Sequence, residues 1–194
     1  MDWQALLNDP RFLGGAAVAA LLLVVLGWAW RRRRQRDPRQ RLREVALDLL
    51  EGIVVPDGDD GQLHIEFVLL TPGGVTLLDL RDVAGHVFGS NAMQDWTVLA
   101  ERRRFTFANP QHAMHDRVAA VRRLLPGIEV TGLVTFTSRA RFTKGLPEHV
   151  VLLDTLIDNL RRQRGEPEAP GLRDAWDRLR REAVAAQVGR LIDD

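Results

Sequence analysis

An uncharged run of 19 residues, from Phe12 to Trp30, is the feature that most constrains how this 194-residue chain folds. All of its residues are apolar or small, so no face of a helix built from them is suited to water. Such a helix spans about 28 Å, close to the roughly 30 Å hydrocarbon core of a bilayer. Trp28 and Trp30 end the run, where indole side chains favour the headgroup layer. The run predicts one N-terminal transmembrane helix.

The charges that follow the run predict its orientation. Residues 31–43 hold eight arginines against one acid, Asp37. Because such positive blocks stay on the cytoplasmic side, we expect a single-pass protein of the cell (inner) membrane, with the N-terminus outside and the C-terminal domain cytoplasmic. A cleaved signal peptide is the alternative, but its positive charge would precede the apolar run. We expect the arginines to contact inner-membrane lipid headgroups; a nucleic-acid-binding arm is the alternative.

The rest of the chain has the composition of a globular domain. The whole chain carries a formal net charge of +1, and residues 1–30 and 31–43 contribute −1 and +7, which leaves −5 for residues 44–194. The hydrophobic fraction of 45% and the charged fraction of 27% exclude wholesale disorder. The absence of cysteine excludes disulfide scaffolds, thiolate metal sites and cysteine nucleophiles.

Apolar periodicity and turn residues divide this part into helices and strands. Strands are expected at 63–70, 75–81 and 130–136, shorter ones at 85–89, 95–98 and 102–107, helices at 41–50, 110–125 and 172–192, and a strand running into a helix at 150–160. The Thr71–Gly74 turn is short enough to join its two strands as an antiparallel hairpin. Asn109 and Pro110 have the residue types of a helix cap and first turn. These elements predict an α/β fold, a mixed sheet flanked by helices.

The same boundaries predict how the chain is divided. We expect a short extracytoplasmic tail (1–11), a transmembrane anchor (12–30), an arginine-rich juxtamembrane segment (31–40), a main domain (41–163), a linker (164–171) and a C-terminal helix (172–194). Small residues spaced four apart in the anchor and an apolar stripe on the C-terminal helix are typical of helix packing, so either helix is a candidate homodimer contact.

Two carboxylates interrupt the apolar strands of the expected hairpin, Glu66 in the first strand and Asp79 in the second. Arg81 shares a strand face with Asp79 because side chains alternate along a strand. Carboxylates in a core-like strand need a cation, a metal or a hydrogen-bond network. Two interpretations follow: a metal site, or a salt bridge from Arg81 to Glu66 or Asp79.

The stretch Ile65–Gly89, then Trp96, then Phe107–Pro110, resembles the NERD (nuclease-related) domain family of the PD-(D/E)XK nuclease-like superfamily. That family has an aspartate in the first hairpin strand, a Pro-x-Gly turn, Glu-x-Lys closing the second strand, and later a tryptophan and Asn-Pro. The order and spacing match over about residues 41–153. The resemblance implies a restriction-endonuclease-like fold.

The resemblance also implies site residues. The family's two acids fall on Glu66 and Asp79 and its lysine on Arg81, all three of a different residue type, and Glu44 is the best substitute for the acid that opens the family's first helix. In that fold such acids hold Mg²⁺ or Mn²⁺, which activates water to attack a phosphodiester of DNA or RNA. Arginine keeps its proton, so Arg81 would stabilise the transferring phosphate rather than act as a base.

Further arginines are candidates to bind the phosphates of a substrate. They are Arg102, Arg103 and Arg104, with Arg139 and Arg141. The net charge of −5 argues against strong non-specific binding of nucleic acid. We therefore expect a membrane-anchored, nuclease-related protein that hydrolyses phosphodiesters with a metal at a divergent site. The alternative is a catalytically inactive, membrane-tethered interaction scaffold on the same fold.

Overall fold

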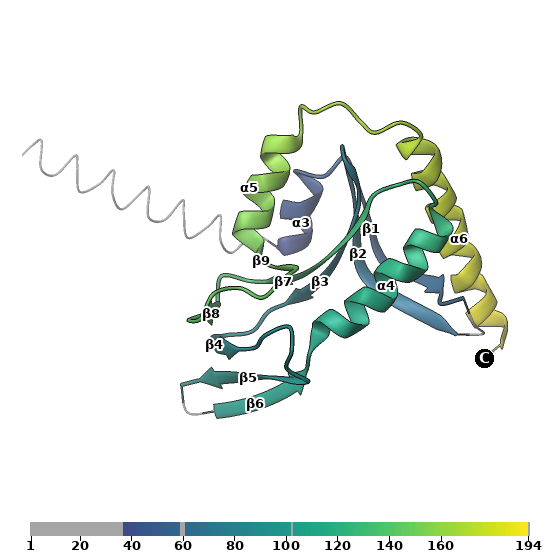
Figure 1. Cartoon of the computed structure of the whole chain (residues 1–194). Coiled ribbons are helices and arrows are strands. Elements are labelled where there is room, and N and C mark those ends of the chain that lie inside the picture. Colours follow the sequence, from purple (N-terminus) through teal and green to yellow (C-terminus); the bar gives the residue numbers. More distant parts are fainter. Residues whose placement is uncertain (1–36, 59–60, 102, 194) are drawn as a thin grey trace, which may run out of the picture. The chain divides into compact units, whose positions relative to one another are not determined.

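The computed structural model describes residues 37–58, 61–101 and 103–193 (Figure 1). The chain divides into two units, residues 1–40 and 41–194. In the first unit Asp37 accepts a hydrogen bond from the backbone N–H of Arg39, at the start of helix α3 (Pro38–Arg43). The expected transmembrane run lies outside the described residues. Within the described part, no helix is long and apolar enough to cross a bilayer.

Five strands of the second unit form a large mixed sheet. They are β1 (Asp48–Pro56), β2 (Gln62–Thr71), β3 (Gly74–Arg81), β7 (Val130–Phe136) and β9 (Val150–Leu152), in the order β1-β2-β3-β7-β9. β1, β2 and β3 pair antiparallel, whereas β7 runs parallel to β3 and β9. The hairpin expected between β2 and β3 is confirmed, with Thr71 opposite Gly74 across the turn.

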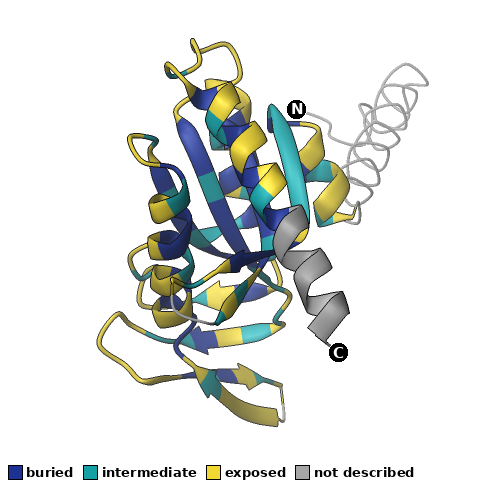
Figure 2. Ribbon diagram, turned by 90° about the vertical axis from the view of Figure 1, so that its right-hand side faces the viewer, coloured by how far each residue is buried: buried dark blue, intermediate teal, exposed yellow. Residues whose placement is uncertain are grey.

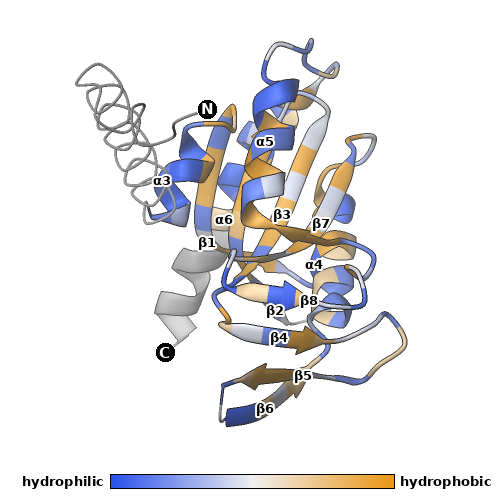
Figure 3. Cartoon of the chain, turned by 90° about the vertical axis from the view of Figure 1, so that its left-hand side faces the viewer, coloured by the Kyte–Doolittle hydropathy of each residue, from blue (hydrophilic) through white to orange (hydrophobic). Residues whose placement is uncertain are grey.

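Helices cover both faces of this sheet. Helices α4 (Pro110–Leu124) and α6 (Leu172–Asp193) lie on one face, and α5 (Leu153–Gln163) lies on the other (Figure 1). Because side chains alternate, β2 sends Val68 to the α4 side and Phe67 to the α5 side. The central strands are accordingly buried (Figure 2), and the hydrophobic strands lie beneath the hydrophilic outer side of α5 (Figure 3).

Helix α4 lies close to the sheet because β7 carries a glycine beneath it. A Cβ added to Gly132 would lie 2.5 Å from Cγ2 of Val118 and 2.7 Å from Sδ of Met114, both on α4. The expected helix is confirmed, and so is its cap, since the Asn109 side chain accepts a hydrogen bond from the backbone N–H of Gln111. The close contact of Gly132 with α4 fixes the position of this helix over β3 and β7.

A smaller sheet follows β3 in the chain. It consists of β4 (Gly85–Phe88), β5 (Asp95–Ala100), β6 (Arg103–Ala108) and β8 (Ala140–Phe142), in the order β6-β5-β4-β8. Trp96 of β5 is fully buried and stacks on Phe136 of β7, with ring centroids 6.2 Å apart. Gly89 makes room for this indole, because a Cβ there would lie 2.2 Å from Cδ2 of Trp96. The aromatic stack joins the two sheets.

One expected element is wrong, and two strands, β1 and β8, were missed. The helix expected at 41–50 ends at Arg43, and residues 48–50 belong to β1, where they pair with 68–70 of β2. The spacing of the apolar residues there is compatible with both a helix and a strand, and the hydrogen-bonded pairing with β2 makes residues 48–50 a strand. Strand β8 has only three residues, too few for a periodic signal. The α/β class with a helix-flanked sheet is confirmed.

The start of β1 binds the C-terminal helix. Asp48 accepts hydrogen bonds from Nε1 of Trp176 at 2.9 Å and from Nη2 of Arg180 at 2.5 Å. Leu172, Trp176, Leu179 and Ala183 are buried within the chain, so this part of the apolar stripe packs on the domain's own core. Burial raises the pKa of Asp48, but the hydrogen bonds from Trp176, Leu49 N–H and Arg180 outweigh it and hold that pKa below its ordinary value.

We predict that Asp48 makes the free energy of unfolding depend on pH in the acid range. A carboxyl whose pKa is lowered by folding stabilises the folded state above its unfolded pKa, and this contribution is lost as the pH falls through the folded pKa. Wild type should therefore exceed Asp48→Asn in free energy of unfolding at neutral pH. The difference should begin to shrink near the ordinary aspartate pKa of about 3.9. Urea unfolding across pH, with Asp95→Asn as an exposed control, measures it; a pH-independent difference would contradict it.

Candidate functional site

Strands β2 and β3 separate at one end, and Glu66 lies in this fork. The last paired residues are Phe67 and Leu78. Beyond this pair, the Glu66 carboxylate replaces the backbone as acceptor, and its Oε2 accepts a hydrogen bond from the Leu80 N–H at 2.9 Å. Glu66 is half-buried. The carboxylate thus has a defined structural partner next to Asp79.

Asp79 faces α4 from β3 and is only 8% exposed. Its Oδ2 accepts a hydrogen bond from Nη2 of Arg81 at 2.8 Å. The same oxygen lies 3.5 Å from Nη1 of Arg117, on α4. A buried carboxylate therefore lies between two guanidinium groups, which offset the cost of removing its charge from water.

Arg117 is the site residue that sequence reasoning missed. Besides its contact with Asp79, its Nε donates to the backbone O of His64 at 2.8 Å. One side chain of α4 thereby binds both β2 and β3. The available signal was its position, because Arg117 lies beside the buried stripe of Met114, Val118 and Val121 on the sheet-facing side of α4.

The structure brings together three of the expected site residues, Glu66, Asp79 and Arg81. Glu44 lies in the turn between α3 and β1. Arg103 and Arg104 lie on β6 of the small sheet, and Arg102 lies outside the described residues. No group of three or more Asp, Glu, His or Cys side chains that could hold a metal is found in the described ranges. Glu66, Asp79 and Glu44 therefore do not form such a group.

The Asn-Pro motif has a structural role at the end of α4. Nδ2 of Asn109 donates to the backbone O of Met93 at 2.9 Å. Gln111 is buried, and its Nε2 donates to Oδ1 of Asn91 at 3.0 Å and to the backbone O of Glu148 at 2.6 Å. These bonds connect the start of α4 to the β4–β5 loop and to the loop between β8 and β9. The motif positions the helix that carries Arg117.

The fold and the fork define a nuclease-related domain. A family model of the nuclease-related domain, NERD, matches residues 34–137, more than half of the chain. The chain belongs to the NERD family, which is consistent with a PD-(D/E)XK-like superfamily origin. No curated protein and no solved structure matches the chain.

The side chains at the fork can be compared with what a divalent metal requires. Mg²⁺ takes six oxygen ligands in near-ideal octahedral geometry, commonly from one or two carboxylates, water and substrate phosphate. Here Oδ2 of Asp79 is bound to two cations and Oε2 of Glu66 to a backbone N–H. A metal bound to Asp79 would also be repelled by both guanidinium groups. In this arrangement a resident Mg²⁺ ion would have to displace the two arginines from Asp79 or bind beside them through the other oxygens of Asp79 and Glu66.

We predict that the two arginines are needed because Asp79 is charged. Arg81→Gln with Arg117→Gln leaves the buried carboxylate without a cation, which should lower the free energy of unfolding by about 3 kcal/mol. Adding Asp79→Asn removes the unpaired charge, so the triple variant should regain much of that loss. Urea unfolding of the wild type, the double and the triple variant measures both effects. A triple variant no more stable than the double would contradict the charge pairing.

Proposed function

We propose that this NERD-domain protein is a membrane-anchored nucleic-acid-binding module whose fork binds a phosphate through Arg81 and does not hydrolyse it. The observation that carries the proposal is the shared oxygen of Asp79, which accepts from Arg81 and lies within ion-pair distance of Arg117. With its carboxylate engaged by cations, the fork is better suited to an anion than to a metal ion. This corresponds to the tethered scaffold among the alternatives that the sequence left open.

Arg81 is the side chain suited to contact the phosphate. Its side chain is 39% exposed, and Asp79 engages Nη2. Guanidinium has five N–H donors in a fixed plane. Nε of Arg81 is buried and has no hydrogen-bond partner in the described part of the chain, so the exposed part of the side chain leaves the Nη groups as the donors that a phosphate can reach. Asp79 holds the plane in place, which lowers the entropy lost when a phosphate binds. Arg117 is a positioning residue, because it holds Asp79 and β2.

Metal-dependent phosphodiester hydrolysis is the second candidate. It is favoured by Glu66 and Asp79 lying opposite each other on adjacent strands at one fork, in a domain of a nuclease-related family. This candidate needs a divalent ion to displace the arginines from Asp79 or to bind beside them. It therefore predicts cleavage that depends on Mg²⁺ or Mn²⁺ and is lost in Asp79→Ala.

Binding and cleavage of oligonucleotides by the full-length chain in detergent micelles separate the two candidates. We expect binding without added divalent ions, weakened about tenfold by Arg81→Gln because one charge-assisted hydrogen bond is lost. Arg139→Gln is the matched control, since it removes an exposed arginine that pairs with Asp82. We expect no cleavage with Mg²⁺ or Mn²⁺. Metal-dependent cleavage lost in Asp79→Ala, or equal binding by wild type and Arg81→Gln, would overturn the proposal.

The membrane anchor is part of the proposal, supported by the uncharged run 12–30 and the arginines after it. The chain has no cysteine, so single cysteines can report its orientation. We predict that Gln4→Cys reacts with a membrane-impermeant thiol reagent in intact spheroplasts. Ser138→Cys, at an exposed position of the domain, should react only after lysis. The opposite labelling pattern, or chain recovered free of membranes, would contradict the anchor.

A further inference from the structure

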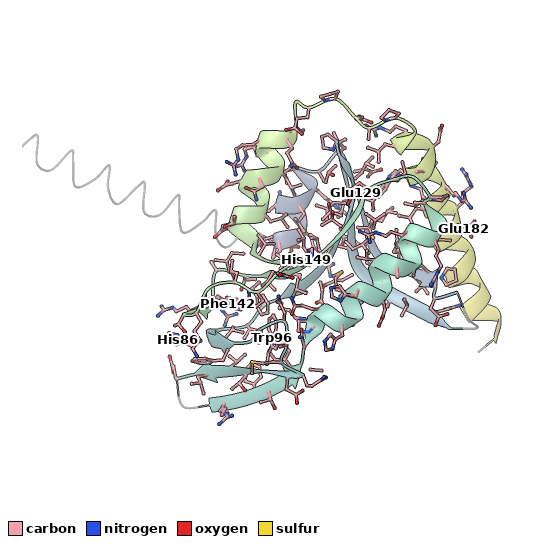
Figure 4. All side chains as sticks on the ribbon, in the orientation of Figure 1. His86, Trp96, Glu129, Phe142, His149 and Glu182 are labelled. Atoms are coloured by element: carbon pink, nitrogen blue, oxygen red, sulfur yellow. The ribbon has the colours of Figure 1, made fainter. Side chains whose placement is uncertain are left out.

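One face of the small sheet is exposed and carries two arginines in a single row. The row runs across four strands through residues that pair in register: Arg104 of β6, Leu99 of β5, His86 of β4 and Arg141 of β8. All four side chains are exposed, Leu99 by 43%. The opposite face holds Trp96 and the aromatic core; Figure 4 shows the labelled His86 further from the large sheet than Trp96. We call this row the basic row.

The positive charge of the basic row is not neutralised by the fold. Within the described ranges, neither Arg104 nor Arg141 has an ion-pair partner. Two arginines close to them in the sequence do not share this combination of a free charge and a place in the basic row. Arg139 pairs with Asp82 at 2.8 Å, and Arg103 lies on the other face of β6. The two arginines are three strand spacings apart, about 14 Å. Two free cations at this separation fit an extended polyanion.

Apolar and aromatic groups lie beside the basic row. Phe88, Thr97 and Thr106 form the next row on the same face. A hollow of about 520 Å³ adjoins this row at Phe88, and Met93, Leu146 and Lys144 also line it, with Glu148 as its acid. Met93 and Leu146 are 41% and 45% exposed. The hollow is of the size that takes small organic groups and has one aromatic ring for stacking.

We propose that this face binds single-stranded nucleic acid, with backbone phosphates at Arg104 and Arg141 and a base against Phe88. A flat sheet with cations and an aromatic group is a common way to bind single strands, because phosphates and stacked bases are recognised together. The inference rests on nucleic acid being the partner of the protein. It concerns a surface separate from the Asp79 fork.

An anionic lipid surface is the competing occupant, because the tip between β5 and β6 carries the exposed Arg103 beside the acidic Glu101. The hollow at Phe88 favours nucleic acid. A base has a planar ring that can stack on the phenyl group, and a lipid headgroup has none. We therefore assign the face to nucleic acid, and the lipid surface is an outcome of the test.

The test compares two double variants that remove the same charge from the same two segments. Full-length chain in detergent micelles is titrated into a fluorescent oligothymidylate at several salt concentrations. Arg104→Gln with Arg141→Gln should weaken binding about tenfold or more at low salt. It should also reduce the slope of log K against log salt by about 1.4, since each phosphate contact on a single strand contributes about 0.7. Arg103→Gln with Arg139→Gln should change both quantities much less.

Photocrosslinking tests the surface directly, because the arginine block before the domain also attracts polyanions. An iodouracil-substituted oligonucleotide should crosslink to Phe88 or His86, also in nanodiscs that contain phosphatidylglycerol. Equal effects of the two double variants, crosslinks confined to residues 31–43, crosslinks abolished by phosphatidylglycerol, or tighter binding of duplex than of single strand would overturn the inference. A loss of binding in Arg81→Gln with none in Arg104→Gln, Arg141→Gln would overturn it and leave the fork proposal standing.

Discussion

The buried carboxylate of Asp79 is the constraint on which the arrangement of the second unit depends. A charge that is 8% exposed at the end of a central strand needs cations close by, and they come from two different elements, β3 and α4. Arg117 also binds the backbone of β2 through His64. The position of α4 over the sheet, the opening of the β2–β3 fork and the orientation of Arg81 are therefore coupled to one ionised group.

The residues by which the family is recognised hold this arrangement together. Asn109 caps α4 and donates to the backbone of Met93, and Trp96 stacks between the two sheets. Gly89 is needed because a side chain there would occupy the space of the indole. These contacts are structural, so they explain why a nuclease-related pattern can be present while the acids and the lysine of the family differ in type.

Sequence patterns predicted most of the fold, and where they failed the reason is physical. The β2–β3 hairpin and α4 have long apolar patterns with clear turn or cap residues, whereas residues 41–50 fit a helix and a strand alike, and only pairing with β2 decides. Asp79 and Arg81 were identified because a strand places them on one face. The role of Arg117 and the alignment of Arg104 with Arg141 in one row could not be identified from the sequence, because each depends on packing between segments distant in the chain.

We propose that arginine, and not a divalent metal, is the partner of Asp79. Electron paramagnetic resonance of Mn²⁺ titrated into the full-length chain tests it directly, with Asp79→Asn as reference, since free and protein-bound Mn²⁺ give different spectra. Mn²⁺ bound at other positions of the chain contributes equally to both proteins and cancels in the comparison. We expect the same fraction of free Mn²⁺ for wild type and Asp79→Asn. Stoichiometric Mn²⁺ bound to the wild type and absent from Asp79→Asn would contradict it.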